Sequence, residues 1–261
     1  MSEFPIEVQN LTKVFKVLHR ERSLKSAVLK WARFRFPRRE EFTALRDISF
    51  QIPKGQTVGV IGRNGSGKST LLTLLAGIYR PTSGTVQVCG RIASLLELGA
   101  GFHPEFTGLE NIYLNGAILG LERAEITRQL DAIIQFADIA EFIDTKLKFY
   151  SSGMVARLGF AVAVHVNPEV LLVDEVLAVG DANFHEKCYS KIDEFKRQGV
   201  TIFFVSHDLD AVRRVCDRVI WIDHHVVRED GKPQDVIDHY EKFEVGSQNN
   251  RARQQAEMTI D

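Results

Sequence analysis

The sequence predicts an α/β protein built around a mostly parallel sheet. Short apolar segments typical of buried strands alternate with longer segments in which apolar residues recur every three or four positions. A glycine-rich phosphate-binding pattern joins one of these strands to one of these helices. The 261 residues, 44% of them hydrophobic, suffice for one large domain with a smaller inserted lobe.

The elements are expected in the following order along the chain. A first strand covers Ile6–Val8 and runs toward Phe15, and the next covers Asp47–Ile52, with alternating apolar residues. A helical lobe is expected from about residue 105 to 165, where apolar residues follow the helical period. The remaining strands are expected at Thr57–Ile61, Val170–Val173, Val200–Val205 and Arg218–Ile222, and the remaining helices at about Lys68–Ala76, Phe184–Lys196 and Leu209–Val215.

Composition excludes several classes of protein. No apolar run approaches the length that a bilayer crossing needs, and the charged start lacks the features of a secretory signal, so we expect a cytosolic location. Cys89, Cys188 and Cys216 lie far apart, which argues against a disulfide framework or a thiolate metal site. A net charge of −1 is not typical of a nucleic-acid-binding domain, and no nucleic-acid partner is expected.

A phosphate-binding loop is predicted between the strand at Thr57–Ile61 and the following helix. Backbone N–H groups of such a loop turn toward phosphate oxygens, and the helix N-terminus adds partial positive charge. Lys68 would reach the β- and γ-phosphates, and the Ser69 hydroxyl would bind Mg²⁺. A glycine-rich turn before an ordinary helix is the alternative. The loop residues are Gly62, Arg63, Asn64, Gly65, Ser66, Gly67, Lys68, Ser69 and Thr70.

Two more polar groups follow buried strands. Asp174 and Glu175 end the strand at Val170–Val173; we expect Asp174 to hold Mg²⁺ through water and Glu175 to polarise the hydrolytic water. His207 follows the next strand and is expected to contact the γ-phosphate. Alone, the acidic pair could merely end a strand and the histidine could merely cap a helix. Because the carboxyl ends of parallel strands meet at one edge, a catalytic site is the better interpretation.

In this order and spacing, the motifs resemble the nucleotide-binding domain of ABC ATPases from about Ile6 to Phe243. The diagnostic addition is Tyr150-Ser151-Ser152-Gly153-Met154, at the place of the family's LSGGQ signature. The resemblance implies a P-loop NTPase of ABC type with a mostly parallel core sheet, an antiparallel β subdomain and an inserted helical lobe. It also implies ATP and Mg²⁺ as ligands.

The resemblance further implies a homodimer in which each ATP lies between one subunit's phosphate loop and the other's signature. Ser151, Ser152 and Gly153 would then face the partner's nucleotide, and Gly180 and Asp181 would bridge the subunits. Phe15 falls where the family stacks an aromatic ring on adenine, with Phe42 as a competitor.

Some positions depart from the family pattern. The signature has Tyr150, Ser152 and Met154 in place of its usual Leu, first Gly and Gln. The family also carries a glutamine that senses the γ-phosphate and Mg²⁺, and Glu97 is the nearest polar residue to that position. The segments LLELGAGFHPEFTGLENI, YSSGM and EVLAVGDANF resemble ATPase subunits of bacterial exporters of O-antigen, capsule or teichoic acid. That resemblance implies export of a lipid-linked polysaccharide through two copies of an integral-membrane subunit, and a peripheral position at the cytoplasmic face of the bacterial inner membrane.

The ATPase domain is expected to cover residues 1–245, with a basic insertion at residues 16–41 and a polar, disordered tail at 246–261. Nine Lys or Arg lie between Lys16 and Arg39 against Glu21 alone, and Trp31 shares an apolar helical stripe with Leu24 and Val28. We expect this helix to lie on an anionic membrane surface. The alternative is a solvated helix that packs Trp31 on the domain. Another transported substrate, or a non-transport ABC ATPase, is the alternative function.

Overall fold

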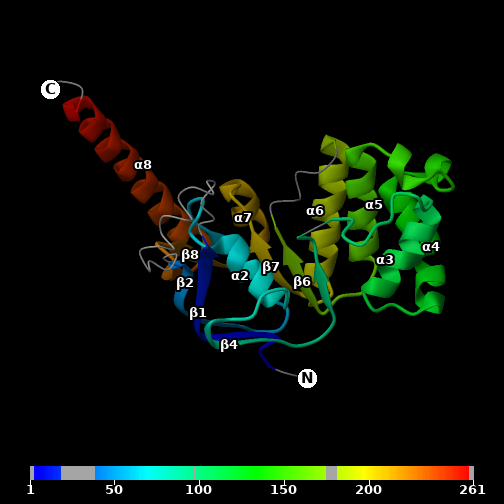
Figure 1. Ribbon diagram of the computed structural model, residues 1–261, viewed down its shortest axis with the longest axis horizontal. Coiled ribbons are helices and arrows are strands. Elements are labelled where there is room, and N and C mark those ends of the chain that lie inside the picture. Colours follow the sequence, from blue (N-terminus) through cyan, green and yellow to red (C-terminus); the bar gives the residue numbers. More distant parts are fainter. Residues whose placement is uncertain (1–2, 19–38, 97, 175–180, 259–261) are drawn as a thin grey trace, which may run out of the picture.

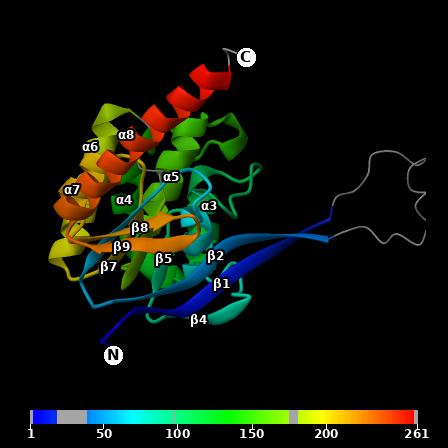
Figure 2. The same ribbon diagram turned by 90° about the vertical axis from the view of Figure 1, so that its left-hand side faces the viewer.

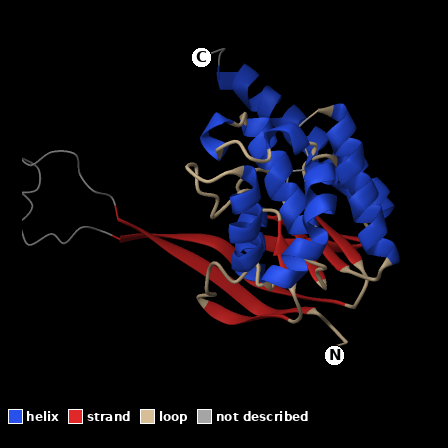
Figure 3. Ribbon diagram, turned by 90° about the vertical axis from the view of Figure 1, so that its right-hand side faces the viewer, coloured by secondary structure: helices blue, strands red, loops and turns tan. Residues whose placement is uncertain are grey.

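The computed structural model describes residues 3–18, 39–96, 98–174 and 181–258. Two sheets and a set of helices are arranged in layers, with the strands gathered on one side and most helices on the other (Figure 3). Within the described residues, no helix is long and apolar enough to cross a bilayer.

A mixed sheet of six strands forms the centre of the described part of the chain. Five of its strands run parallel, and β9 at the edge is antiparallel to β8. The order across this sheet is β5 (Ile92–Ser94), β6 (Val170–Val173), β7 (Thr201–Val205), β3 (Thr57–Ile61), β8 (Arg218–Asp223) and β9 (Val226–Gly231).

A second, antiparallel sheet covers one face of this centre (Figure 2). Its order is β2 (Arg39–Ile52), β1 (Ile6–Leu18) and β4 (Ser83–Val88). Helix α2 (Lys68–Leu75) lies between the two sheets, because its buried leucines share one core cluster with β1, β2 and the alternate residues of β3 and β7.

The opposite face of the central sheet packs against α5 (Ser152–Val164), α6 (Ala182–Arg197), α7 (Leu209–Val215) and α8 (Pro233–Met258). Helices α3 (Gly108–Ile118) and α4 (Arg123–Ala137) join α5 in a lobe that lies at the far end from α8 (Figure 1). Short 3₁₀ turns at Ala140–Phe142 and Leu147–Phe149 connect α4 to α5. The predicted fold class is confirmed.

Two boundaries differ from the prediction. The sequence assigns residues 16–18 and 39–41 to the insertion, but they pair in the β1–β2 ladder, where Lys16 lies opposite Glu41 and Leu18 opposite Arg39. The rest of the insertion lies outside the described residues. The tail is expected to be disordered, yet α8 continues to Met258. Gln, Arg, Ala and Glu, frequent after position 250, are good helix formers, and no proline follows Pro233 to stop the helix.

Candidate nucleotide-binding site

The predicted site residues follow three neighbouring strands and lie at one edge of the central sheet. β6, β7 and β3 are adjacent and parallel, so their carboxyl ends lie together. The phosphate loop follows β3, Asp174 follows β6, and His207 comes two residues after β7. Ligands of open α/β sheets bind at this edge.

The phosphate loop is organised around Lys68, whose side chain is buried. The ammonium Nζ of Lys68 donates to the carbonyl oxygens of Gly62 and Arg63, at 2.6 and 3.1 Å. The N–H of Ser66 donates to the same Arg63 carbonyl at 3.1 Å. The loop therefore curls around the lysine and places it at the N-terminus of α2, where an anion is stabilised.

Two glycines permit this path. Gly62 has φ of 147° and Gly67 has φ of 110°, both in the region that favours glycine. A side chain on Gly62 would overlap the Ile222 carbonyl of β8, and one on Gly67 would overlap the Ala44 carbonyl of β2 and approach Leu45 to 2.6 Å.

One hydroxyl of the loop has no hydrogen-bond partner among the described residues. Ser66 is buried, and its Oγ has no hydrogen-bond partner among the described residues. Space around Gly65 is open, since a Cβ there would have no atom within 4 Å. An orphaned hydroxyl beside open space, a buried cation and a helix N-terminus fit a phosphate chain.

The residues predicted to bind Mg²⁺ fit that ion through the chemistry of their donor atoms, a hydroxyl and a carboxylate. Ser69 is exposed in the first turn of α2, and Asp174 is half-buried directly after β6, at the same edge of the sheet. The described residues contain no group of three His, Cys, Asp or Glu side chains that could hold a metal unaided. Magnesium usually keeps waters and shares its ligands with substrate phosphates, so such a sparse site is typical of it.

His207 is exposed at the same edge. Its neighbour Asp208 caps α7, because its carboxylate accepts the N–H groups of Asp210 and Ala211 at 3.0 and 3.1 Å. The N–H of Asp208 in turn donates to Ser206 Oγ at 3.0 Å. The capping role that a histidine could have filled here therefore belongs to Asp208, and the phosphate contact of His207 stays a prediction.

The two candidate aromatic residues lie on one face of the β1–β2 hairpin, since Phe15 is the cross-strand partner of Phe42. Phe15 contacts Tyr79 edge to face at 5.5 Å, and Lys13 Nζ lies 4.9 Å from its ring centroid. Phe42 is half-exposed and contacts the ring of His225. Adenine stacking on Phe15 stays a prediction, and no sequence pattern indicated that Tyr79 would lie beside it.

The signature segment lies on α5, in the lobe that Figure 1 places apart from α2. Ser151 caps α5 by accepting the N–H of Met154 at 3.2 Å, and Ser151 and Ser152 are exposed. Gly153 is half-buried, and a Cβ added to it would have no atom other than Ser151 Oγ nearby. An exposed helix N-terminus of this kind can bind an anion that belongs to another molecule.

Tyr150 replaces the family's leucine by filling the core of the lobe. Its hydroxyl donates to the carbonyl oxygen of Phe142 at 2.7 Å and its ring is buried. Burial raises the pKa of the Tyr150 hydroxyl above its ordinary value, and the charge of Asp144 adds to the increase. The tyrosine is therefore a neutral structural donor.

Asp181 begins α6, where its carboxylate accepts the N–H of Phe184 at 2.9 Å and its side chain stays exposed. Glu175, Gly180 and Glu97 lie outside the described residues, so the water-polarising, bridging and metal-binding roles predicted for them stay predictions.

Buried asparagines of α3 fix the loop that follows position 97, a role that sequence patterns did not reveal. Asn111 donates to the carbonyl oxygens of His103, Phe106 and Thr107 at 2.9 to 3.2 Å and accepts the N–H of His103 at 2.7 Å. Asn115 donates to the Ala100 carbonyl at 2.7 Å. The only signal was a pair of asparagines four residues apart inside an apolar helix.

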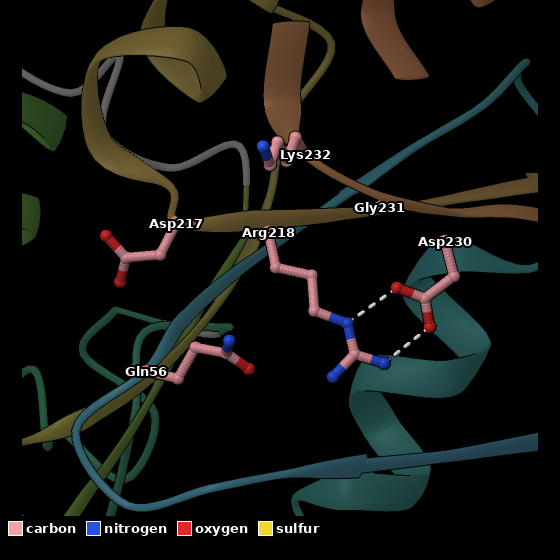
Figure 4. Close-up of a pocket in the computed structure, with 6 residues that line it drawn as sticks. All are labelled: Gln56, Asp217, Arg218, Asp230, Gly231 and Lys232. Atoms are coloured by element: carbon pink, nitrogen blue, oxygen red, sulfur yellow. Dashed lines mark hydrogen bonds and ion pairs between the residues drawn. The ribbon is translucent and has the colours of Figure 1, made fainter. Parts of the chain in front are cut away.

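A pocket of about 470 Å³ lies at the opposite edge of the sheet (Figure 4). Gln56, Asp217 and Arg218 precede or begin β3 and β8, so the pocket is near the amino ends of these strands. Arg218 is already paired with Asp230, with Nε 2.6 Å from Oδ1. This pocket is therefore not part of the nucleotide site.

Comparison with known proteins supports the interpretation of these motifs. Residues 45–178 match the family model described as ABC transporter. An O-antigen export system ATP-binding protein of Klebsiella pneumoniae is 49% identical over 91% of this chain and 97% of its own length. One from Myxococcus xanthus is 55% identical over 84% of this chain, which spans 50% of that relative. A teichoic acids export ATP-binding protein of Bacillus anthracis is 42% identical over 92% of this chain and 43% of its own length.

Solved structures give the same fold. A dimeric, post-hydrolysis state of the ATP-binding cassette MJ0796 bound to ADP and Pi matches with a TM-score of 0.70 at 22% identity, over 87% of this chain and 98% of that one. A structure described as the ATP-binding subunit of an ABC transporter matches with a TM-score of 0.71 at 21% identity, over 90% of this chain and 93% of that one. The chain belongs to the ABC transporter family.

Proposed function

We propose that this chain powers export of a lipid-linked polysaccharide by binding and hydrolysing ATP, as a homodimer bound to separate integral-membrane subunits at the cytoplasmic face of the bacterial inner membrane. The observation that carries the enzymatic part is the meeting of the phosphate loop, Asp174 and His207 at one sheet edge. The names of relatives at 42 to 55% identity support the substrate class.

Each residue has a role in the proposed reaction. When ATP binds, the Lys68 ammonium exchanges the Gly62 and Arg63 carbonyls for the β- and γ-phosphates. Ser69 and Asp174 would hold Mg²⁺, which would supply positive charge beside the phosphate oxygens. Glu175 polarises the attacking water, and His207 stabilises the charge that develops on the γ-phosphate.

Dimerisation completes the site. The signature is on α5, in a different lobe from the phosphate loop, which supports a role for Ser151, Ser152 and Gly153 at a second subunit's nucleotide. Asp181, exposed at the start of α6, would bridge the two subunits. Closure on ATP and opening after hydrolysis would then move the membrane partner.

The membrane subunits are proposed to contact an apolar patch on the helical lobe, formed by Phe106 and Phe149. These side chains are 40% and 70% exposed. Their segments lie side by side, because the N–H of Leu147 donates to the Phe106 carbonyl and that of Lys148 to the Pro104 carbonyl. Exposed aromatics on a rigid frame are typical of a protein contact, and the loop after position 97 would connect this patch to the nucleotide.

The basic segment at 19–38 lies outside the described residues, and we propose that it binds the anionic membrane surface. Its sequence, with Trp31 among basic residues, supports this. Reversing the charges of Lys30, Arg33 and Arg35 should impair export while ATP hydrolysis by the isolated protein stays intact. Unchanged export would show that the segment is a solvated helix of the domain.

The proposal is tested by purification from membranes and by nucleotide binding. The wild-type chain should co-purify with a multi-span membrane protein and hydrolyse ATP, whereas Lys68→Ala should lose nucleotide affinity and hydrolysis but keep the partner. Depletion should cause lipid-linked glycan to accumulate. Accumulation of another substrate would overturn the substrate class, and co-purification with nucleic acid in place of a membrane protein would overturn transport.

A further inference from the structure

We propose that Glu244 of α8 is a positioning residue for the phosphate loop and acts through an ion pair with Arg63. The inference rests on the proposed function, since it takes residues 62–70 as the nucleotide-binding loop. It assigns to α8 a part in nucleotide affinity that no motif indicates, because Glu244 lies outside all of the motifs named above.

The contact joins two segments that are distant in sequence. Arg63 Nε lies 3.1 Å from Glu244 Oε1, and the two side chains are only 28% and 22% exposed. This Glu244 oxygen has no aligned hydrogen bond among the described residues, so attraction between the charges is what holds it there. A pair shielded to this degree is screened by salt less than a pair on the open surface.

The backbone of Arg63 also holds two other residues of the loop, Ser66 and Lys68, by hydrogen bonds. Its carbonyl oxygen accepts hydrogen bonds from Lys68 Nζ and from the N–H of Ser66, both at 3.1 Å. The side chain therefore points to α8 while the backbone of the same residue holds the lysine that would bind phosphate. A shift of Arg63 would be transmitted to Lys68 directly.

The segment of α8 that carries Glu244 is firmly fixed. Trp221 of β8 contacts Tyr240 and Phe243 with ring centroids at 5.4 and 5.3 Å. The Arg228 guanidinium lies over both Trp221 and Phe243, at 4.4 and 3.9 Å from their centroids, and pairs at 2.8 Å with the buried carboxylate of Asp223. This packing holds the residue next to Glu244 on the central sheet.

The same strand touches the loop directly, because the Ile222 carbonyl occupies the space where a Gly62 side chain would be. The start of the loop is thus held on one side by β8 and on the other by α8, through Glu244. Binding sites whose loops are held in place before binding lose less affinity to ordering, so loss of the ion pair should weaken nucleotide binding.

Removing one partner alone does not test this idea cleanly. Glu244→Gln would loosen the loop but would also leave the positive charge of Arg63 uncompensated near the phosphates, which favours ATP. The double variant Arg63→Gln/Glu244→Gln removes the pair and keeps the net charge, so positioning and charge are separated.

The experiment is an equilibrium titration of the full-length chain with ATP and ADP without Mg²⁺, so that no turnover occurs. We expect the double variant to bind both nucleotides about three- to tenfold more weakly, the range for loss of one partly buried pair. The matched control is Arg213→Gln/Glu241→Gln, which removes a 2.8 Å pair between α7 and the same helix at unchanged net charge. The control should bind like wild type.

Two results would overturn the inference. The first is wild-type nucleotide affinity in the Arg63/Glu244 double variant. The second is an equal loss of nucleotide affinity in the control, which would mean that only the general stability of α8 matters. Thermal unfolding without nucleotide compares the stability of the two variants. Lys68→Ala separates this inference from the proposed function. If Lys68→Ala abolishes binding while the double variant binds normally, the inference alone fails; if Lys68→Ala binds normally, the site assignment fails.

Discussion

Replacing Gly67 by alanine tests the geometry of the phosphate loop. Gly67 has φ of 110°, and left-handed backbone conformations cost a residue with a side chain about 1–2 kcal/mol. The new methyl would also overlap the Ala44 carbonyl and lie 2.6 Å from Leu45 Cδ2, an overpacking that costs about 1–3 kcal/mol. Gly67→Ala should therefore lower the free energy of unfolding by about 2–5 kcal/mol, as measured by urea titration without nucleotide.

Gly77 is the matched control. Its φ is 73°, and a Cβ added to it would have no atom within 4 Å, so Gly77→Ala bears the backbone cost alone, about 1–2 kcal/mol. If the loop of Gly67→Ala moves to relieve the overlap, part of the cost should appear as weaker ATP binding. Equal destabilisation by both substitutions, with ATP affinity unchanged in both, would refute the packing argument.

Three further predictions concern thiols, pH and turnover. Burial raises the pKa of Cys188 and Cys216 to about 12, so about one in ten thousand of each is thiolate at pH 8. A thiol reagent should therefore label the exposed Cys89 fast and the other two cysteines only when the protein unfolds. Rapid labelling of all three cysteines would contradict the core packing. Burial lowers the pKa of His165, so the unfolded chain binds a proton at about pH 6.5 and the native chain binds it only at lower pH. Stability should then fall as pH drops from 7 toward 5, and less so in His165→Gln; an identical pH dependence in both proteins would rule this out. Glu175→Gln should bind ATP normally and accumulate as a closed dimer on size exclusion, and wild-type turnover would remove Glu175 from its role.

Elements with a strong apolar pattern were predictable from the sequence. The strands at Thr57–Ile61 and Val170–Val173 are buried along their whole length and match the prediction residue for residue, as does α7. β4 and β9 were missed because none of their residues is fully buried and most of their side chains are polar, charged or small. β4 depends on pairing with β1, which is distant in sequence and which local sequence does not encode, whereas β9 pairs with the preceding strand, β8.

The candidate site also has features that the sequence predicts and features that it does not. Three motifs following three strands predicted a common edge, and the order β6, β7, β3 confirms it. The tie between Arg63 and Glu244 was not predictable, because it depends on how α8 crosses β8. The sequence predicted a disordered tail at 246–261, but the structure continues α8 to Met258. Polar composition alone does not distinguish a solvated helix from a disordered tail.

The most direct test of the proposed function measures the transported substrate in cells. When the chromosomal copy is depleted, we expect lipid-linked glycan to accumulate and surface polysaccharide to decline, with both restored by the wild-type chain and neither by Lys68→Ala. Normal surface polysaccharide and no accumulated glycan in cells without the chain would contradict the proposal.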